Sequence, residues 1–300
     1  MTLARQQVIS FVWETKRRLN TLSERVSERV RAWGIDVQDS LETQSSFIAF
    51  GRRDIQPVVL KVIRQPGDEW RCGDVLAAFD GRGMARVYEY VEGAVLIERL
   101  NPGTSLASLS LDGRDEEATE ILAEVIDRMS QAPGLMSEQL KAFDSAQDWG
   151  EGFHRYLESG DDQIPTSLVE QGQRIYFDLC SSQRDARLLH GDLQHYNVLF
   201  DSDRGWIAID PKGVVGAIEY EIGASLRNPN EKPELFASAE SIERRLKCFE
   251  SRLKLDLDRA LAWAFAQAVL SAIWSIEDGF AVGAENPSLR LADAIRTILK

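Results

Sequence analysis

Three polar residues within positions 188–213 have the types and the spacing that phosphoryl transfer requires. This stretch reads LLHGDLQHYNVLFDSDRGWIAIDPKG, in which Asp192 precedes Asn197 by five positions and Asp210 closes a later apolar run. A carboxylate such as Asp192 can accept the proton of an attacking hydroxyl. The oxygens of Asn197 and Asp210 are hard ligands of the kind that Mg²⁺ binds. Because transfer of a γ-phosphoryl group mainly demands positioning and charge neutralisation, the order H-x-D-x-x-x-x-N and then D predicts a catalytic residue at Asp192 and metal ligands at Asn197 and Asp210.

Short apolar runs predict the strands that position these residues. The runs are Arg187 to Leu189, Val198 to Phe200 and Trp206 to Ile209, and the turn-forming segment Asp201 to Gly205 lies between the last two. The polar residues therefore fall in the loops at strand ends, where we expect His190 to hold the loop by hydrogen bonds. Each acid, taken alone, is compatible with an ordinary loop residue that has no catalytic role. Only the agreement of order, spacing and strand context indicates a catalytic site.

An upstream strand supplies a lysine that suits the phosphates of ATP. Positions 58–62 read VVLKV, and Lys61 inside this β-branched run would be costly to bury without an anionic partner. The alternative is an edge lysine whose ammonium group reaches water. Before this strand, positions 43–53 read TQSSFIAFGRR, which is typical of a turn over phosphates followed by a strand. Ser45 and Ser46 are the candidate phosphate contacts in that turn, although no G-x-G-x-x-G is present.

These motifs resemble those of the aminoglycoside phosphotransferase superfamily, whose loop usually reads HGDLHxxN. The segment DPKGVVGAIEYEIGASLRNP, from Asp210 to Pro229, is similar to the streptomycin 6-kinase and hydroxyurea kinase branch, and the likeness runs from about Gln38 to Gly279. It implies an α+β, protein-kinase-like fold with two lobes. The expected nucleotide-binding lobe, 1–100, has an antiparallel sheet, helices and an extra N-terminal helix. The expected lobe 101–300 is mainly helical and carries the catalytic loop and the acceptor site.

The resemblance also implies further nucleotide contacts. A kinase lysine pairs with a glutamate on the next helix, but Cys72 stands near that position, so we favour Glu69 as the partner of Lys61, with Asp74 as the alternative. The hinge that meets adenine through its backbone is expected at Glu98 to Leu100. Lys212 follows the metal-binding acid, and it either contacts a phosphate or pairs with a nearby acid such as Glu219 or Glu221, which leaves both possibilities open.

Acidic side chains near Asp192 are the candidate contacts to the acceptor. Glu277 and Asp278 are placed first, because in the family this helix end helps to form the acceptor pocket. A single acid is more often a solvated surface residue. The further candidates are Glu219, Glu221, Asp148, Glu151, Asp161 and Asp162.

The charge composition of the chain limits the classes of molecule that it is expected to bind. The chain has 300 residues, 35 Lys and Arg against 48 Asp and Glu, and a net charge of -13, which argues against nucleic acid and favours a cationic acceptor. The three cysteines show no C-x-x-C spacing, so neither a disulfide framework nor a zinc site is indicated. The N-terminus lacks the apolar core of a signal peptide, and the apolar run 260–274 is interrupted by Gln267. We therefore expect a cytoplasmic protein that makes no membrane contact and has a buried helix at 260–274.

Apolar residues at helical spacing predict the remaining elements. The expected helices are 10–33, 116–129, 168–179, 234–253, 258–277 and 287–299.

Together these motifs predict an ATP- and Mg²⁺-dependent small-molecule O-phosphotransferase, and the resemblance implies an aminoglycoside (streptomycin-like) or hydroxyurea resistance kinase. Two alternatives stay open. One is a housekeeping small-alcohol kinase of the same fold, since a fold does not fix a substrate. The other is a catalytically idle nucleotide-binding module, suggested by Cys72 at the position of the usual glutamate.

Overall fold

The computed structural model describes residues 21–132 and 134–299, which form two compact units. Of the described residues, the first unit comprises 21–70 together with Tyr88–Arg99, and the second comprises Arg71–Val87 and those from Leu100 to 299. The segment 71–87 thus groups with the second unit rather than with the expected nucleotide-binding lobe. Local packing explains this, because the Ala85 N–H donates to the Ala208 carbonyl at 2.9 Å.

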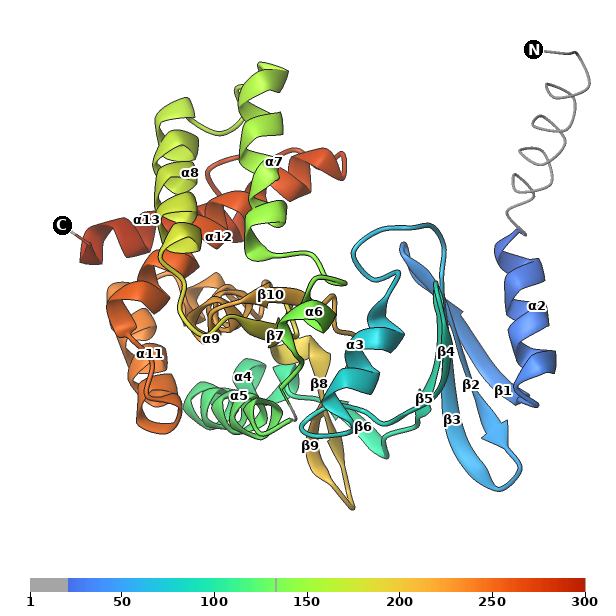
Figure 1. The fold of residues 1–300 in the computed structure, drawn as a ribbon. Coiled ribbons are helices and arrows are strands. Elements are labelled where there is room, and N and C mark those ends of the chain that lie inside the picture. Colours follow the sequence, from blue (N-terminus) through green and yellow to red (C-terminus); the bar gives the residue numbers. More distant parts are fainter. Residues whose placement is uncertain (1–20, 133, 300) are drawn as a thin grey trace, which may run out of the picture. The chain divides into compact units, whose positions relative to one another are not determined.

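A five-stranded sheet in the order β1-β2-β3-β5-β4 forms the first unit (Figure 1). Its strands are β1 (Asp36–Glu42), β2 (Ser46–Arg53), β3 (Gln56–Ile63), β4 (Val87–Val91) and β5 (Ala94–Glu98). The pairs β1/β2, β2/β3 and β3/β5 are antiparallel. Alternate residues Val58, Leu60 and Val62 on β3 are fully buried and belong to one core cluster. Strand alternation therefore places Lys61 on the opposite face of the sheet.

One helix, α2 (Leu22–Ala32), packs on this sheet (Figure 1). It begins at a capping box between Thr21 and Glu24, and it sets Val26 and Val30 against the core cluster. The sequence predicted a longer helix, from 10 to 33. Its first half lies outside the described residues, and its second half is confirmed.

Helices and two small sheets form the second unit. The helices are α3 (Cys72–Phe79), α4 (Ala107–Leu111), α5 (Asp115–Ser130), α6 (Ser137–Leu140), α7 (Ala146–Ser159), α8 (Thr166–Ser181), α9 (Ile218–Glu221), α10 (Gly223–Leu226), α11 (Ala239–Leu253), α12 (Leu257–Glu277) and α13 (Pro287–Ile298), with the short 3-10 helices η1 (His195–Asn197) and η2 (Pro233–Leu235). The strands are β6 (Pro102–Ser105), β7 (Arg187–Leu189), β8 (Val198–Asp201), β9 (Gly205–Ala208) and β10 (Val214–Gly216). They pair as β10-β7 and as β6-β8-β9. The predicted α+β class is confirmed.

The helix α12 is the core of the second unit. It is long and apolar enough to cross a membrane by length and composition, but 67% of its most apolar window is buried inside the protein. Its interior polar residue Gln267 donates to the Tyr220 carbonyl at 2.7 Å, which satisfies the side chain that interrupts the apolar run. The predicted buried helix is confirmed.

The other predicted helices are present as α5, α8, α11 and α13. The prediction for α11 was five residues too long at its start, because Pro233 begins η2 and Ser238 then caps α11 by accepting from the Ser241 N–H. The sequence did not predict α7 as a helix.

A buried ion pair joins α5 to α11. The Arg245 guanidinium donates to both carboxylate oxygens of Asp115 at 2.6 and 3.1 Å, and to the carbonyls of Ser225 and Asn228 at 3.0 and 2.9 Å. Although burial opposes ionisation of the carboxyl, the bonds from Arg245 hold the pKa of Asp115 below its usual value. All nitrogens of Arg245 are thus used inside the fold.

Candidate active site

The hairpin β8/β9 brings the two predicted metal ligands to neighbouring positions. Its register pairs Val198 with Ala208, and the Ile209 N–H then donates to the Asn197 carbonyl at 2.8 Å. Asn197 immediately precedes β8, and Asp210 follows Ile209 directly. Pairing within one hairpin is therefore enough to set these two side chains at the same end of the strands.

The pair β7/β10 supports the loop that carries Asp192. Leu189 lies opposite Val214, and the His190 carbonyl accepts from the N–H groups of Lys212 and Gly213 at 3.0 and 2.9 Å. Gly213 has a φ of +83°, and a Cβ at this position would lie 2.4 Å from Val75 Cγ2. Only glycine fits there without displacing α3. The loop after β7 and the segment after Asp210 are thus bonded to each other.

His190 braces this loop through both ring nitrogens. The ring is fully buried, with Nε2 2.8 Å from the Ile209 carbonyl and Nδ1 3.3 Å from the Asp192 backbone nitrogen. Nε2 must therefore carry the proton, and Nδ1 accepts the backbone N–H. Burial lowers the pKa of His190, which keeps the ring neutral in this role.

Asn197 is oriented by Asp192. Its amide nitrogen Nδ2 donates to the Asp192 backbone carbonyl at 2.9 Å and lies 3.5 Å from the carboxylate oxygen Oδ2. Because Nδ2 is the donor, the amide oxygen is left as the atom that suits a metal ion. Asp210 adopts a left-handed φ of +61°, which is uncommon outside glycine and typical of residues held in place at functional sites.

The oxygen atoms at this hairpin end fit Mg²⁺. No group of three or more His, Cys, Asp or Glu that could hold a metal occurs among the described residues. The two predicted ligands at this hairpin end, Asn197 and Asp210, would supply one amide oxygen and one carboxylate. Magnesium commonly takes one or two protein oxygens and completes its shell with water and phosphate oxygens. Asn197 and Asp210 are of that kind.

A buried ion pair lies on β3 in the first unit. The Lys61 ammonium is 2.7 Å from the Glu69 carboxylate, and the two side chains are 10% and 20% exposed. Glu69 lies in the turn before α3 rather than on the helix, and Asp74 pairs instead with Arg71 at 2.9 Å. Of the two acids open from the sequence, Glu69 is the one that contacts Lys61.

A polar cavity of about 300 Å³ opens beside Asp192 in the second unit. Trp149 and Trp274 meet edge to face in its wall, with ring centroids 5.8 Å apart. It is lined by Trp149, Gly191, Asp192, Gln194, Lys212, Arg227, Asn228, Asn230, Ser271, Trp274, Ser275, Asp278, Asn286, Pro287 and Ser288. Aromatic faces together with amides and hydroxyls are the surfaces that bind hydroxylated rings. This cavity is the candidate acceptor site.

A model of the aminoglycoside/hydroxyurea antibiotic resistance kinase family matches residues 34–279. The chain belongs to this family. It is 33% identical over 242 residues to a streptomycin 3''-kinase of Klebsiella pneumoniae, an alignment that covers 80% of this chain and 87% of that relative. It is 29% identical over 220 residues to a streptomycin 6-kinase of Streptomyces griseus, covering 68% and 66% of the two chains. The resemblance inferred from Asp210 to Pro229 is therefore confirmed.

A solved structure shows the same fold. A thermostable mutant of an aminoglycoside phosphotransferase, in a ternary complex with ADP and hygromycin B, superposes with a TM-score of 0.64 at 17% identity, covering 90% of this chain and 97% of that chain. The predicted protein-kinase-like fold is confirmed. The chain is a kinase that acts on a small molecule, and its relatives imply that it uses ATP.

The other residues of this resistance kinase that were predicted to contact the nucleotide belong to both units: Ser45, Ser46 and Glu98 to the first and Leu100 to the second. Ser45 is exposed in the turn between β1 and β2, whereas Ser46 is buried and its hydroxyl lies 3.0 Å from that of Thr43. Ser45 is thus the better placed of the two serines to meet a phosphate. Glu98 ends β5 opposite Val58, and Leu100 is buried in the second unit.

Glu277 and Asp278, which were placed first for the acceptor, and the further candidate Glu219 lie in different surroundings in the structure. Asp278 caps α12 and lines the cavity beside Asp192. Glu277, its neighbour, is bonded to Arg155 at 2.9 Å and is not part of the lining. Glu219 lines a different surface hollow with Arg184 and Arg259.

Three of the other acids are engaged elsewhere. Asp148 accepts from the backbone N–H and hydroxyl of Ser145 in the capping box that begins α7, Glu151 pairs with His154, and Asp161 accepts from the Tyr156 hydroxyl.

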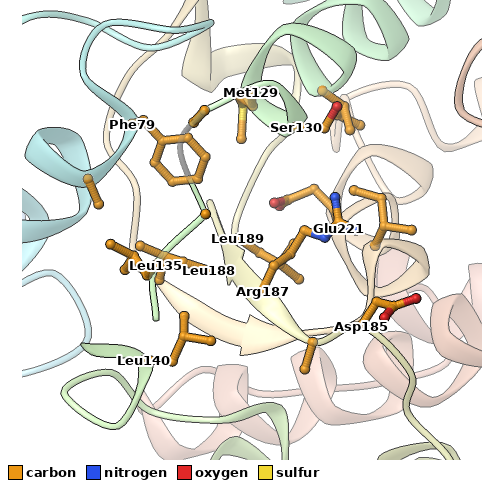
Figure 2. Close-up of a pocket in the computed structure, with 16 residues that line it drawn as sticks. Phe79, Met129, Ser130, Leu135, Leu140, Asp185, Arg187, Leu188, Leu189 and Glu221 are labelled. Carbon is orange, nitrogen blue, oxygen red and sulfur yellow. The ribbon is translucent and has the colours of Figure 1, made fainter. Parts of the chain in front are cut away.

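Glu221 lies behind the catalytic loop. Its two carboxylate oxygens accept the N–H groups of His190 and Gly191 at 2.7 and 3.1 Å. It also lines an apolar cavity of about 290 Å³ whose wall includes Leu188 and Leu189 of β7; Figure 2 shows these side chains with Phe79 and Met129 across the cavity. Glu221 is therefore a positioning residue rather than an acceptor contact. Burial in these surroundings raises the pKa of Glu221 to about 7.

The position of Glu221 behind the catalytic loop predicts that kcat depends on pH and that Glu221→Gln removes this dependence. Only the ionised carboxylate offers two full acceptors to the loop amides, so kcat is expected to rise as pH increases from about 6 to 8, through the pKa near 7. In Glu221→Gln the side-chain amide NH2 faces one backbone N–H, so that this N–H loses its acceptor. We expect kcat of this variant to be lower by about tenfold or more. We also expect it to show no pH-dependent step between about pH 6 and 8. The measurement is kcat at saturating substrates from pH 5.5 to 9. Identical profiles for the two proteins would refute the role.

Several cavity residues were missed by the sequence interpretation, namely Trp149, Arg227, Asn228 and Trp274. Arg227 and Asn228 belong to the family-specific segment YEIGASLRNP, so that motif contained the relevant information. Nothing local distinguished these two residues from their neighbours.

Proposed function

We propose that this resistance kinase transfers the γ-phosphoryl group of ATP, with Mg²⁺, to a hydroxyl of a streptomycin-like aminoglycoside. The observation that carries the proposal is the arrangement around Asp192: a carboxylate bonded to Asn197, on a loop tied to the Asp210 segment, opening into a polar cavity with two tryptophans. Similarity to two streptomycin kinases supports the acceptor class.

Asp192 would act on the acceptor hydroxyl. Its side chain is 28% exposed and Asp192 lines the cavity, so a bound hydroxyl can donate to it. As the acceptor oxygen attacks phosphorus, the hydroxyl proton passes to Asp192, and the bond from phosphorus to the oxygen shared with the β-phosphate breaks. ADP leaves with the electron pair of that bond. His190, Asn197 and Glu221 keep the loop fixed during this step.

Asn197 and Asp210 would hold the metal ion, which when bound neutralises charge on the phosphates. Lys61 would contact the α- and β-phosphates, since Glu69 fixes its ammonium group at 2.7 Å in a buried position. Ser45 is a further candidate contact from the first unit. The proposed division of labour therefore assigns nucleotide binding to the first unit and the acceptor to the second.

The acceptor is proposed to be cationic. Asp278 contributes a carboxylate to the cavity, and the net charge of -13 attracts cations to the protein in general. The tryptophans Trp149 and Trp274 supply aromatic faces for a ring or an ammonium group. A cytoplasmic location is proposed, where ATP is available.

An acceptor panel tests the function. The kinase is incubated with Mg²⁺ and ATP plus streptomycin, hydroxyurea, hygromycin B or simple amino alcohols, and products are followed by mass spectrometry for a phosphate-sized gain. Phosphorylation of streptomycin is the expected result. Transfer only to a simple alcohol would support the housekeeping alternative, and ATP binding without any product would support an idle module.

A further inference from the structure

Arg227 is a buried cation whose hydrogen-bonding groups are not used up by the fold. It follows α10, its side chain is 11% exposed, and its Nη2 lies 3.8 Å from Asp192 Oδ1. Its Nη1 is buried and has no hydrogen-bond partner among the residues that the structure describes. The separation from Asp192 exceeds a hydrogen bond, so the pair is held by charge alone.

The same region shows how this chain satisfies an arginine with a structural task. Arg245 is 1% exposed, and its guanidinium makes four hydrogen bonds, two to Asp115 and one each to the carbonyls of Ser225 and Asn228. These carbonyls lie two residues before and one residue after Arg227. The backbone is therefore fixed on both sides of Arg227, while the Arg227 head is left with donors to spare.

Burying a guanidinium with unused donors is costly unless an anion joins it during the working cycle. Arg227 lines the cavity that also contains Asp192 and Lys212. The anion that must come within bonding distance of the Asp192-bound hydroxyl is the phosphoryl group in transfer, whose charge is spread over three oxygens. A planar guanidinium matches two such oxygens better than an ammonium group does.

We propose that Arg227 is a catalytic residue that donates Nη–H groups to the non-bridging oxygens of the transferring phosphoryl group. This inference rests on the proposed function. Arg227 keeps its protons throughout: the acceptor oxygen–phosphorus bond forms, the bond to the ADP oxygen breaks, and the hydroxyl proton goes to Asp192. In the free enzyme Arg227 offsets the charge of Asp192. In the transition state it offsets the phosphoryl oxygens, and it remains bonded to the phosphate of the product.

Kinetics of Arg227→Ala provide the first test. Loss of a donor aimed at developing charge is expected to lower kcat by about 10²–10³-fold. The acceptor KM and the ATP Kd should stay within about threefold. Guanidinium chloride, at concentrations that leave the protein folded, should restore part of kcat. Arg252→Ala, the same change at a half-exposed surface arginine, is the matched control and should leave kcat unaltered. A loss confined to KM, or one that guanidinium does not restore, would overturn the proposal.

A double variant separates phosphoryl contact from mere positioning of Asp192. If Arg227 acted only by holding the base, Asp192→Asn/Arg227→Ala would be as active as Asp192→Asn alone. Direct contact predicts that the double variant is at least about tenfold slower than Asp192→Asn. Equal rates would refute a catalytic role.

Phosphate binding provides a test that does not depend on turnover. Inorganic phosphate should raise the Tm of the wild-type kinase relative to chloride at the same ionic strength, and it should not raise the Tm of Arg227→Ala. Failure of every acceptor in the panel would defeat the proposed function and with it the catalytic role of Arg227, whereas loss of the phosphate effect alone would contradict only the Arg227 inference. Equal phosphate shifts in both proteins, or none in the wild type, would contradict it.

Discussion

Asp192→Asn is expected to lower kcat for phosphoryl transfer by about 10²–10⁴-fold, the usual contribution of a general base. Asparagine has nearly the same shape but accepts no proton at neutral pH. The bonds that shape the loop mostly involve the backbone of residue 192, whose N–H lies 3.3 Å from His190 Nδ1 and whose carbonyl accepts from Asn197 at 2.9 Å. These survive the substitution, so the lost activity reports the carboxylate itself.

Initial rates with the best acceptor, together with the ATP Kd, check this prediction. Nucleotide affinity is expected to stay within about twofold, because Asp192 contributes no metal ligand in the proposed arrangement. Asp203→Asn is the matched control, since Asp203 is an exposed residue of the β8/β9 turn. Full turnover by Asp192→Asn would remove Asp192 from the mechanism and, with it, the proposed function.

The part of the site that the sequence predicted is the part built from local pairing. The runs at 187–189, 198–200 and 206–209 became β7, β8 and β9 with ends displaced by no more than one residue. A hairpin needs only a turn and two apolar runs, and both are visible in the sequence. Once β8 and β9 pair, Asn197 and Asp210 must be neighbours.

The acids were harder to place, because their roles depend on which side of a short helix they occupy. Glu219 and Glu221 both belong to the single turn of α9, and residues two apart on a helix face different directions. Glu221 consequently points inward to the catalytic loop, while Glu219 lines a hollow with Arg184 and Arg259. The spacing of residues in the sequence does not show which face of α9 points toward the catalytic loop, so Glu219 and Glu221 appeared equivalent.

The helix α7 and its tryptophan were missed for a tertiary reason. Gly150 and Gly152 lower the helix propensity of this segment. The structure explains them, because a Cβ on Gly150 would lie 2.8 Å from the Tyr176 ring and one on Gly152 would lie 2.8 Å from Leu270 Cδ1. Close packing against α8 and α12 therefore selects residues that weaken the local pattern. This packing also brings Trp149 to Trp274, which is 125 residues later in the chain.

Asp115→Ala is expected to reduce the free energy of unfolding by about 3–5 kcal/mol, the usual result of breaking a buried ion pair. Asp115 is 6% exposed and Arg245 is 1% exposed, so the substitution leaves a guanidinium buried beside an apolar methyl group. Urea unfolding at pH 7 measures the effect. The double variant Asp115→Leu/Arg245→Met removes both charges and should be clearly more stable than Asp115→Ala. A double variant as unstable as the single one would show that the bonds, rather than the unpaired charge, carry the effect.

The stability that the Asp115–Arg245 ion pair contributes changes with pH in a defined direction. Because the folded state lowers the pKa of Asp115, the pair contributes its full stability above the unfolded pKa of about 3.9, and this contribution is lost as pH falls through the lower folded value. The stability difference between wild type and Asp115→Ala should therefore shrink in acid.

The ion pair also supports the active site, since Arg245 donates to the carbonyls of Ser225 and Asn228 on either side of Arg227. An Asp115→Ala protein that is still folded at low temperature should consequently lose kcat as well as stability, because the backbone that aims Arg227 at the cavity is no longer fixed.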